Sequence, residues 1–193
     1  MYSTPLGSNA SYGDRLRGVL SLDQRTFRDV EQDTNANGQA ALTVLLAALA
    51  SGIGAYFGQD WMRNMIGGAV SSLVQWIVFS FAAYFVGASL FATPATSVTP
   101  GQVLRGIGFA QAPKLLNVLG FLPLVGGIIR LVTFIWFLVA AITALRESFE
   151  FDTGRAIGTG LIAMIVAVVV EIVLAIVLGI TSGVFGAFSS LLW

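Results

Sequence analysis

Long uncharged stretches dominate this chain and restrict what it can fold into. Between Ile157 and Trp193 the only charged residue is Glu171. An apolar run of about 20 residues is long enough to cross the hydrocarbon core of a bilayer as a helix. Over the whole chain, 56% of the residues are hydrophobic and 10% are charged, whereas soluble domains average about 25% charged residues. A chain this poor in charge cannot cover a water-exposed surface, so we expect an all-α integral membrane protein.

The composition also excludes several kinds of chemistry. The 193 residues include no cysteine and no histidine, which removes disulfides, thiol catalysis, most zinc sites and histidine-based catalytic triads. Ten basic and ten acidic residues leave no net charge, so nucleic acid is not an expected partner. No nucleophile–base pair or metal-ligand cluster occurs at a plausible spacing. We therefore expect neither an enzyme nor a bound cofactor or metal.

Residues 1–38 form a polar head that precedes the apolar part of the chain. They hold nine of the twenty charged residues. Apolar residues between Leu16 and Val30 recur at spacings that predict one short amphipathic helix, and the sequence DTNANG at 33–38 has turn chemistry. A solvated head that rests on the bilayer is the favoured interpretation, and a dedicated docking helix is the alternative.

Residues 39–182 are expected to form a five-helix transmembrane bundle, followed by a short apolar tail at 183–193. Four segments are long and apolar enough to span the membrane: 40–58, 67–91, 128–145 and 157–181. The third span, before the segment 128–145, is expected to be short and broken. Only 115–129 is free of charge there, and Pro123 and Gly126 interrupt it. A full span has to include Pro113 and Lys114, with the lysine reaching towards the interface.

The positions of the basic residues predict the orientation. With five spans and a cytoplasmic N-terminus, eight basic residues lie inside and two outside. Those inside are Arg15, Arg17, Arg25, Arg28, Arg105, Lys114, Arg146 and Arg155, and those outside are Arg63 and Arg130. If the third segment only enters and leaves on one side, the split is seven to three. We therefore expect a multi-pass protein of the cell membrane whose C-terminus lies opposite its cytoplasmic N-terminus.

An acidic group lies in the expected cytoplasmic segment between the last two spans. Its members, Glu147, Glu150 and Asp152, lie beside Arg146 and Arg155. An ion-paired loop is the ordinary interpretation, and a protein-docking site is the alternative.

Two polar side chains lie deep within the expected spans. Glu171 occupies a place in a row of small residues spaced four apart, so it should face another helix. A charge at that depth costs at least about 2.5–3.5 kcal/mol unless it is paired or protonated. Gln75 lies at nearly the same depth in the second span, and the two side chains are expected to face the bundle interior. A packing contact with Glu171 protonated is the favoured interpretation, and a proton or cation site is the alternative.

Several motifs, in their order along the chain, resemble those of a known family. The segment GFAQAPKLL at 108–116 is followed by FLPLVGGII, a tryptophan-containing helix and AITALRESFEFDTGRAI, and it is preceded by GVLSLDQRTFRDVEQDTNANGQAALTVLLAALASGIG. The motif residues are Gly108, Phe109, Pro113, Lys114, Trp136 and Arg146. Together they resemble the Yip family of Ypt/Rab-interacting multi-pass membrane proteins, most of all its bacterial branch.

The resemblance implies a fold with five spans and a cytoplasmic N-terminus more firmly than it implies an activity. Eukaryotic relatives reside in early secretory membranes, bind prenylated Rab-type GTPases and act in vesicle trafficking or membrane shaping. Their Asp-Leu-Tyr-Gly-Pro signature before the first span is absent here, so GTPase binding is not carried over, and the family provides no catalytic residue.

Three functions follow as hypotheses. The first is a non-enzymatic membrane protein that organises or adapts other membrane proteins through helix packing and cytoplasmic segments. The second is an accessory structural subunit of a larger membrane complex. The third is a small transporter or channel that uses Glu171. Besides the lipid bilayer, the expected partners are other integral membrane proteins.

Overall fold

The computed structural model describes residues 10–55, 61–94 and 96–177, and every regular element in these ranges is helical. Four of the described helices are long and apolar enough to cross a membrane. They are Thr34–Ala55, Met65–Phe91, Gly126–Phe149 and Thr153–Leu174. The expected all-α, multi-pass membrane class is thereby confirmed. The apolar tail expected at 183–193 lies outside the described residues.

The polar head contains two α-helices where one amphipathic helix was expected. Its elements are α1 (Tyr12–Leu20), α2 (Gln24–Gln32) and a 3₁₀ turn, η1 (Thr34–Ala36). Ser11 and Asp14 form a capping box at the start of α1, and the Asp23 side chain accepts a hydrogen bond from the backbone N–H of Arg25 at the start of α2. Leu22 between the helices has a left-handed φ of 57°. The capping preference of aspartate therefore starts a new helix at this point.

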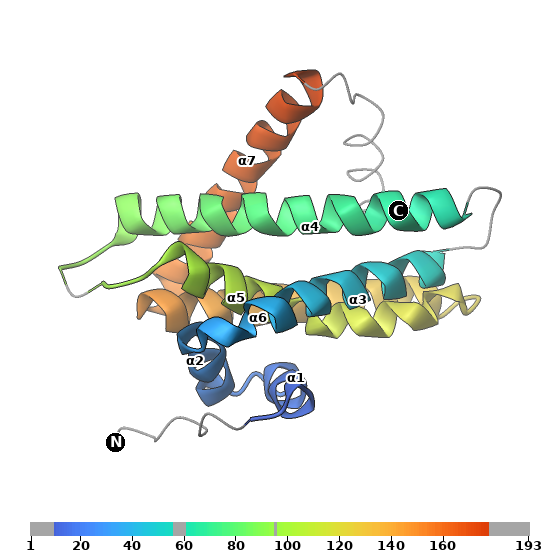
Figure 1. Ribbon diagram of the computed structural model, residues 1–193, viewed down its shortest axis with the longest axis horizontal. Helices are drawn as coiled ribbons and strands as arrows, with labels where there is room; N and C mark the ends of the chain where they lie inside the picture. Colours follow the sequence, from blue (N-terminus) through green and yellow to red (C-terminus); the bar gives the residue numbers. More distant parts are fainter. Residues whose placement is uncertain (1–9, 56–60, 95, 178–193) are drawn as a thin grey trace.

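The body of the molecule consists of longer helices that run along its longest axis (Figure 1). Its elements are α3 (Asn37–Ala55), α4 (Trp61–Val86) with its π-helical continuation η2 (Gly87–Phe91), α5 (Pro100–Ala110), the 3₁₀ segment η3 (Ala112–Phe121), α6 (Gly126–Phe149) and α7 (Thr153–Val177). In Figure 1, α3, α5 and α6 lie side by side, α4 lies along them, and α7 crosses α4 at a steep angle. The head packs against one end of this bundle, which we call the head end.

The third segment differs from the single broken span that was expected. It consists of α5 and the ten-residue η3, and the α-helix ends before Pro113. Proline has no N–H to donate and its ring clashes with the preceding turn of an α-helix. The backbone N–H of Lys114 then bonds to the Gln111 carbonyl at 2.9 Å, which is the 3₁₀ pattern. Gly126 does not interrupt this segment, because it begins α6.

Close contacts at glycines show the direction of each element. Gly108 lies against Ala40, and Gly120 lies against Gly54, so α5 and η3 run parallel to α3. By the same kind of contact, α4 begins beside the end of α3 and ends at the head end, where the Phe91 ring lies against Gly158 of α7. The chain therefore runs along the bundle four times, in α3, α4, α5–η3 and α6, before α7 crosses it at a steep angle (Figure 1).

Candidate functional site

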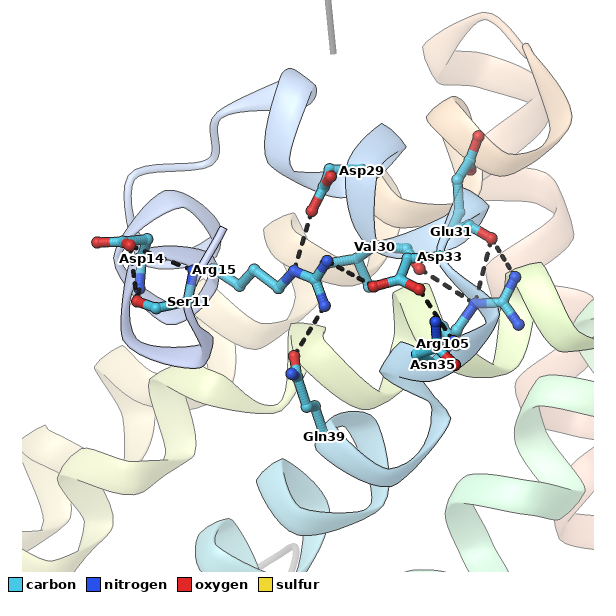
Figure 2. A network of polar contacts seen from close by, with 10 residues as sticks. All are labelled: Ser11, Asp14, Arg15, Asp29, Val30, Glu31, Asp33, Asn35, Gln39 and Arg105. Atoms are coloured by element: carbon cyan, nitrogen blue, oxygen red, sulfur yellow. Dashed lines mark hydrogen bonds and ion pairs between the residues drawn. The ribbon is translucent and has the colours of Figure 1, made fainter. Parts of the chain in front are cut away.

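The head is joined to the bundle by a buried arginine of α1. The Arg15 side chain is only 3% exposed. Its Nε lies 2.9 Å from Asp29 Oδ2, one terminal nitrogen lies 2.7 Å from Asp33 Oδ2, and the other donates to Gln39 Oε1 at 2.9 Å (Figure 2). The hydrogen bond from Arg15 lowers the pKa of Asp33. One guanidinium thus links α1 to α2 and to the start of α3, and its buried charge is neutralised.

A second buried arginine, Arg105 of α5, holds the end of α2. It is 4% exposed, and it donates hydrogen bonds to the backbone carbonyls of Val30 and Glu31 (Figure 2). It also donates to Asn37 Oδ1 at 3.1 Å. The last carbonyls of a helix lack partners within it and carry partial negative charge. Arg105 therefore caps α2 and fixes it against the bundle.

Two glutamates lie at the contact between α2 and α6. Glu147 of α6 is buried, and its Oε2 lies 2.6 Å from Arg28 Nε of α2. Glu31 is 6% exposed, and neither its Oε2 nor the neighbouring Ser148 Oγ completes a hydrogen bond. Burial, together with the smaller effect of the nearby Glu147 carboxylate, raises the pKa of Glu31 to about 7. One arginine thus faces two acidic groups where the head meets α6.

The acidic segment that was expected to be an ion-paired loop is therefore divided. Asp152 pairs with Arg155 at 3.4 Å, in agreement with the expectation, whereas Glu147 belongs to α6 and pairs with Arg28 of the head. Such a long-range pair has no local signal in the sequence.

The first half of the family-like motif lies at the crossing of three helices. A Cβ atom on Gly108 would lie 2.8 Å from the Ala40 Cβ and 3.1 Å from the Trp76 ring, so only glycine fits there without a shift. Phe109 is fully buried, and its ring meets that of Tyr12 edge-on, with 6.2 Å between the centroids. The Tyr12 hydroxyl in turn bonds to Thr43 Oγ1 at 3.0 Å. The motif therefore joins α5 to α3, α4 and the head.

Lys114 lies further inside the bundle than expected. Its Nζ lies 3.8 Å from the centroid of the Phe137 ring, and Phe137 occupies the middle of α6. A cation over an aromatic face is attracted by the ring quadrupole. The structure thus places the amine half-way along α6, because η3 carries it inwards alongside α3.

A polar cluster between α3, η3 and α6 was missed by the sequence analysis. Asn117 Nδ2 donates to Ser51 Oγ at 3.0 Å, and the Thr133 hydroxyl donates to Asn117 Oδ1 at 2.5 Å. Nearer the far end, Arg130 donates to the carbonyls of Gly54 and Gly120. The signal was present, since Asn117 is an amide within an otherwise apolar stretch.

The resemblance carried by the family-like motif extends over most of the chain when it is compared with models of protein families. Residues 17–177 match the family model of the Yip1 domain. The chain belongs to the Yip1 domain family. The matched range of the Yip1 domain begins within α1 and ends with α7, so it includes most of the head. No curated protein and no solved structure matches the chain.

The remaining predicted residues of this Yip1 domain are half-buried. Gln75 and Glu171 lie on helices that pack together, and no hydrogen bond between the two appears among the described residues. Trp136 is the chain neighbour of Phe137, whose ring lies under the Lys114 amine. Arg146 has a buried Nε without a partner.

The described part of the Yip1 domain offers no metal centre. No group of three acidic side chains in it could hold an ion. Its polar chemistry instead serves to join helices, at the head end through Arg15 and Arg105 and within the bundle through Asn117.

Proposed function

We propose that this Yip1-domain protein is a non-enzymatic membrane protein that organises or adapts other membrane proteins. The observation that carries the proposal is the fixed head. Because Arg15 and Arg105 bond it to the bundle, the head and the turn between α6 and α7 form one ordered polar surface. Its exposed charged residues are Asp14, Arg17, Arg25, Arg28, Glu150, Asp152 and Arg155. A rigid surface with charges of both signs suits specific docking of a protein, because little freedom is lost on binding.

The proposed topology has five membrane crossings with the N-terminus in the cytoplasm. Two observations support it: α5 and η3 extend along α3 from Gly108 to Gly120, and, without Lys114, which lies within the bundle, seven basic residues lie on the proposed cytoplasmic side against two on the other. A reporter fused after Asp33 should be cytoplasmic, and one fused after Trp193 should be on the opposite side. If both reporters lie on the same side, the number of crossings is even and the topology is wrong.

The organising role is tested by isolating the full chain from its own membranes in mild detergent. We expect several membrane proteins to copurify, and we expect the double variant Arg17→Glu with Arg25→Glu to lose them, because these charges are exposed. The lipid-side variant Val70→Ile is the control and should retain them. Copurification of one complex at fixed stoichiometry would favour the accessory-subunit hypothesis. Copurification that the charge reversal leaves unchanged would refute docking through this surface.

A transporter is the second candidate, and the third segment favours it. Transporters place substrate sites at interrupted helices lined by polar groups, and η3 carries Lys114 and Asn117 within the bundle. Purified protein in liposomes should then conduct protons or small ions, and Glu171→Gln should abolish the flux. If liposomes that contain the native chain show no flux of protons or small ions, the transporter hypothesis is refuted.

A further inference from the structure

The turn between η3 and α6 is apolar and lies at the end of the bundle opposite the head (Figure 1). Its residues 121–125 have the sequence FLPLV, and we call them the apolar tip. Phe121 is 54% exposed and Leu124 is 97% exposed. Residues 115–129 carry no charge, and the next basic residue, Arg130, donates to backbone carbonyls of α3 and η3. An exposed apolar patch of this kind marks a contact surface.

The described connections at the head end differ from the apolar tip. The connection between η2 and α5 contains threonine and serine, and the one between α6 and α7 contains two acidic residues. Polar residues of this kind suit a connection that lies in water. The apolar tip has none of them, so water is a poor environment for it.

The backbone holds the apolar tip in a tight, ordered turn. The Gly126 N–H donates to the Leu122 carbonyl at 2.9 Å, and a Cβ atom on Gly126 would overlap the Gly120 carbonyl oxygen. Leu124 has a left-handed φ of 68°, which leucine rarely adopts because its Cβ crowds the backbone. The turn therefore holds the Leu124 side chain away from the protein, where only an apolar surrounding would give it contacts.

The length of α6 places the apolar tip at the far boundary of the hydrocarbon core. Gly126 lies 21 positions from Glu147, which is buried at the head end. This distance is roughly 32 Å at the rise of an α-helix, and the hydrocarbon core of a bilayer is about 30 Å thick. The tip therefore lies where acyl chains meet headgroups.

A charged residue of α4 marks the same boundary. Gly52 of α3 lies against Met65 of α4, and Gly54 lies against Gly120. Because α3 and α4 run in opposite directions, the exposed Arg63, two residues before Met65, lies at about the level of Gly120. An arginine at the end of a span reaches towards the headgroups. The apolar tip, which follows Gly120, begins at this level.

We propose that the apolar tip is an interaction surface for lipid and anchors the third segment in the far leaflet, at the boundary between acyl chains and headgroups. Apolar side chains of membrane-bound segments bury themselves at this depth. Exposed apolar residues of α6 continue the surface from the tip along the bundle, namely Ile128, Leu131 and Val132. The anchor goes beyond the proposed organising role and does not depend on it.

Thiol labelling in nanodiscs that hold one chain each tests the anchor, because the chain contains no cysteine and both faces of a nanodisc are open to water. Leu124→Cys should react with a charged maleimide at least about tenfold more slowly than Ser97→Cys, since an apolar surrounding disfavours the thiolate. Ser97 is the control, because it is exposed in the connection before α5. In denaturing detergent the two variants should react equally. Equal rates in nanodiscs would refute the anchor.

Quenching by nitroxide lipids measures the depth and identifies what covers the apolar tip. A fluorophore on Leu124→Cys should be quenched more strongly by a nitroxide near the headgroup than by one near the end of the acyl chain. Ile135→Cys, on an exposed position nine residues into α6, should show the opposite order. Slow labelling without quenching would mean that protein covers the tip, and it would overturn the proposal. The copurification test of the organising role is independent of both measurements.

Discussion

Replacing Glu31 with glutamine should hold the head more tightly to the bundle at alkaline pH. Glu31 is buried at the contact of α2 with α6, beside Glu147. Arg28 already pairs with Glu147, and Arg105 approaches the Glu31 backbone instead of its carboxylate. Ionised Glu31 therefore adds a second carboxylate to a buried contact in which the one nearby arginine, Arg28, already pairs with Glu147. The amide has a similar shape and never ionises.

The pKa shift of Glu31 gives the magnitude. Burial raises its pKa from 4.5 to about 7, and one pKa unit corresponds to about 1.4 kcal/mol. The docked carboxyl binds its proton more tightly than the released one, so docking weakens as pH rises from about 4.5 and is weakest above about 7. If the released head has the ordinary pKa, the loss is about 3.5 kcal/mol, roughly three-hundredfold in the ratio of docked to released head.

Hydrogen exchange of the α1 and α2 amides measures this ratio in the full chain. Native protein and Glu31→Gln are compared in nanodiscs at the same pH, so the intrinsic exchange chemistry cancels. At about pH 8 the variant should exchange up to roughly three-hundredfold more slowly, and at about pH 4.5 the two should nearly agree. Glu150→Gln is the matched control, because Glu150 is exposed, and should behave as the native chain. Equal protection of native and Glu31→Gln protein at pH 8 would refute a charged, buried carboxylate.

Three further substitutions test the packing, each by melting in detergent. Gly108→Ala should destabilise by about 1–3 kcal/mol because its Cβ has no room, whereas Gly127→Ala, whose Cβ meets nothing within 4 Å, should stabilise by about 0.5–1 kcal/mol; equal effects would contradict the crossing. Arg15→Met should destabilise the head by about 3–5 kcal/mol, since it leaves buried Asp29 unpaired, and exposed Arg25→Met should be neutral. Thr133→Val should remove one interhelical bond worth about 0.6 kcal/mol, and a loss above about 3 kcal/mol would contradict a packing role.

The long spans could be predicted because their signal is local. The length of an apolar run can be read directly from the sequence. The expected span 128–145 accordingly lies within α6, and the expected span 67–91 agrees with the apolar helix Met65–Phe91. The kink at Pro113 was predictable for the same reason, since proline acts on its own turn. The ten 3₁₀ residues that follow were not, because packing against α3 decides the hydrogen-bond pattern there.

The docking of the head had no comparable signal. A pair such as Arg28 with Glu147 joins residues 119 positions apart, and in the sequence each is simply a charge in a polar stretch. Arg15 equally looks like a solvated surface residue until Asp29, Asp33 and Gln39 surround it. Burial of a charge is a property of tertiary contacts, so the sequence favoured a solvated head and the structure contains a docked one.

The third segment also has consequences for biogenesis. With Pro113, Lys114 and Asn117 it is a weak insertion signal, and its neighbours are α3, which is synthesised before it, and α6, which is synthesised after it. The segment therefore reaches its final place only once α6 has emerged from the ribosome and closed over it. In a truncated chain that ends at Phe121 and has been released from the ribosome, an Asn117→Cys thiol should be open to a water-soluble label, and in one extended beyond Phe149 it should be protected. Labelling that is already blocked in the shorter chain would show that the segment inserts without α6.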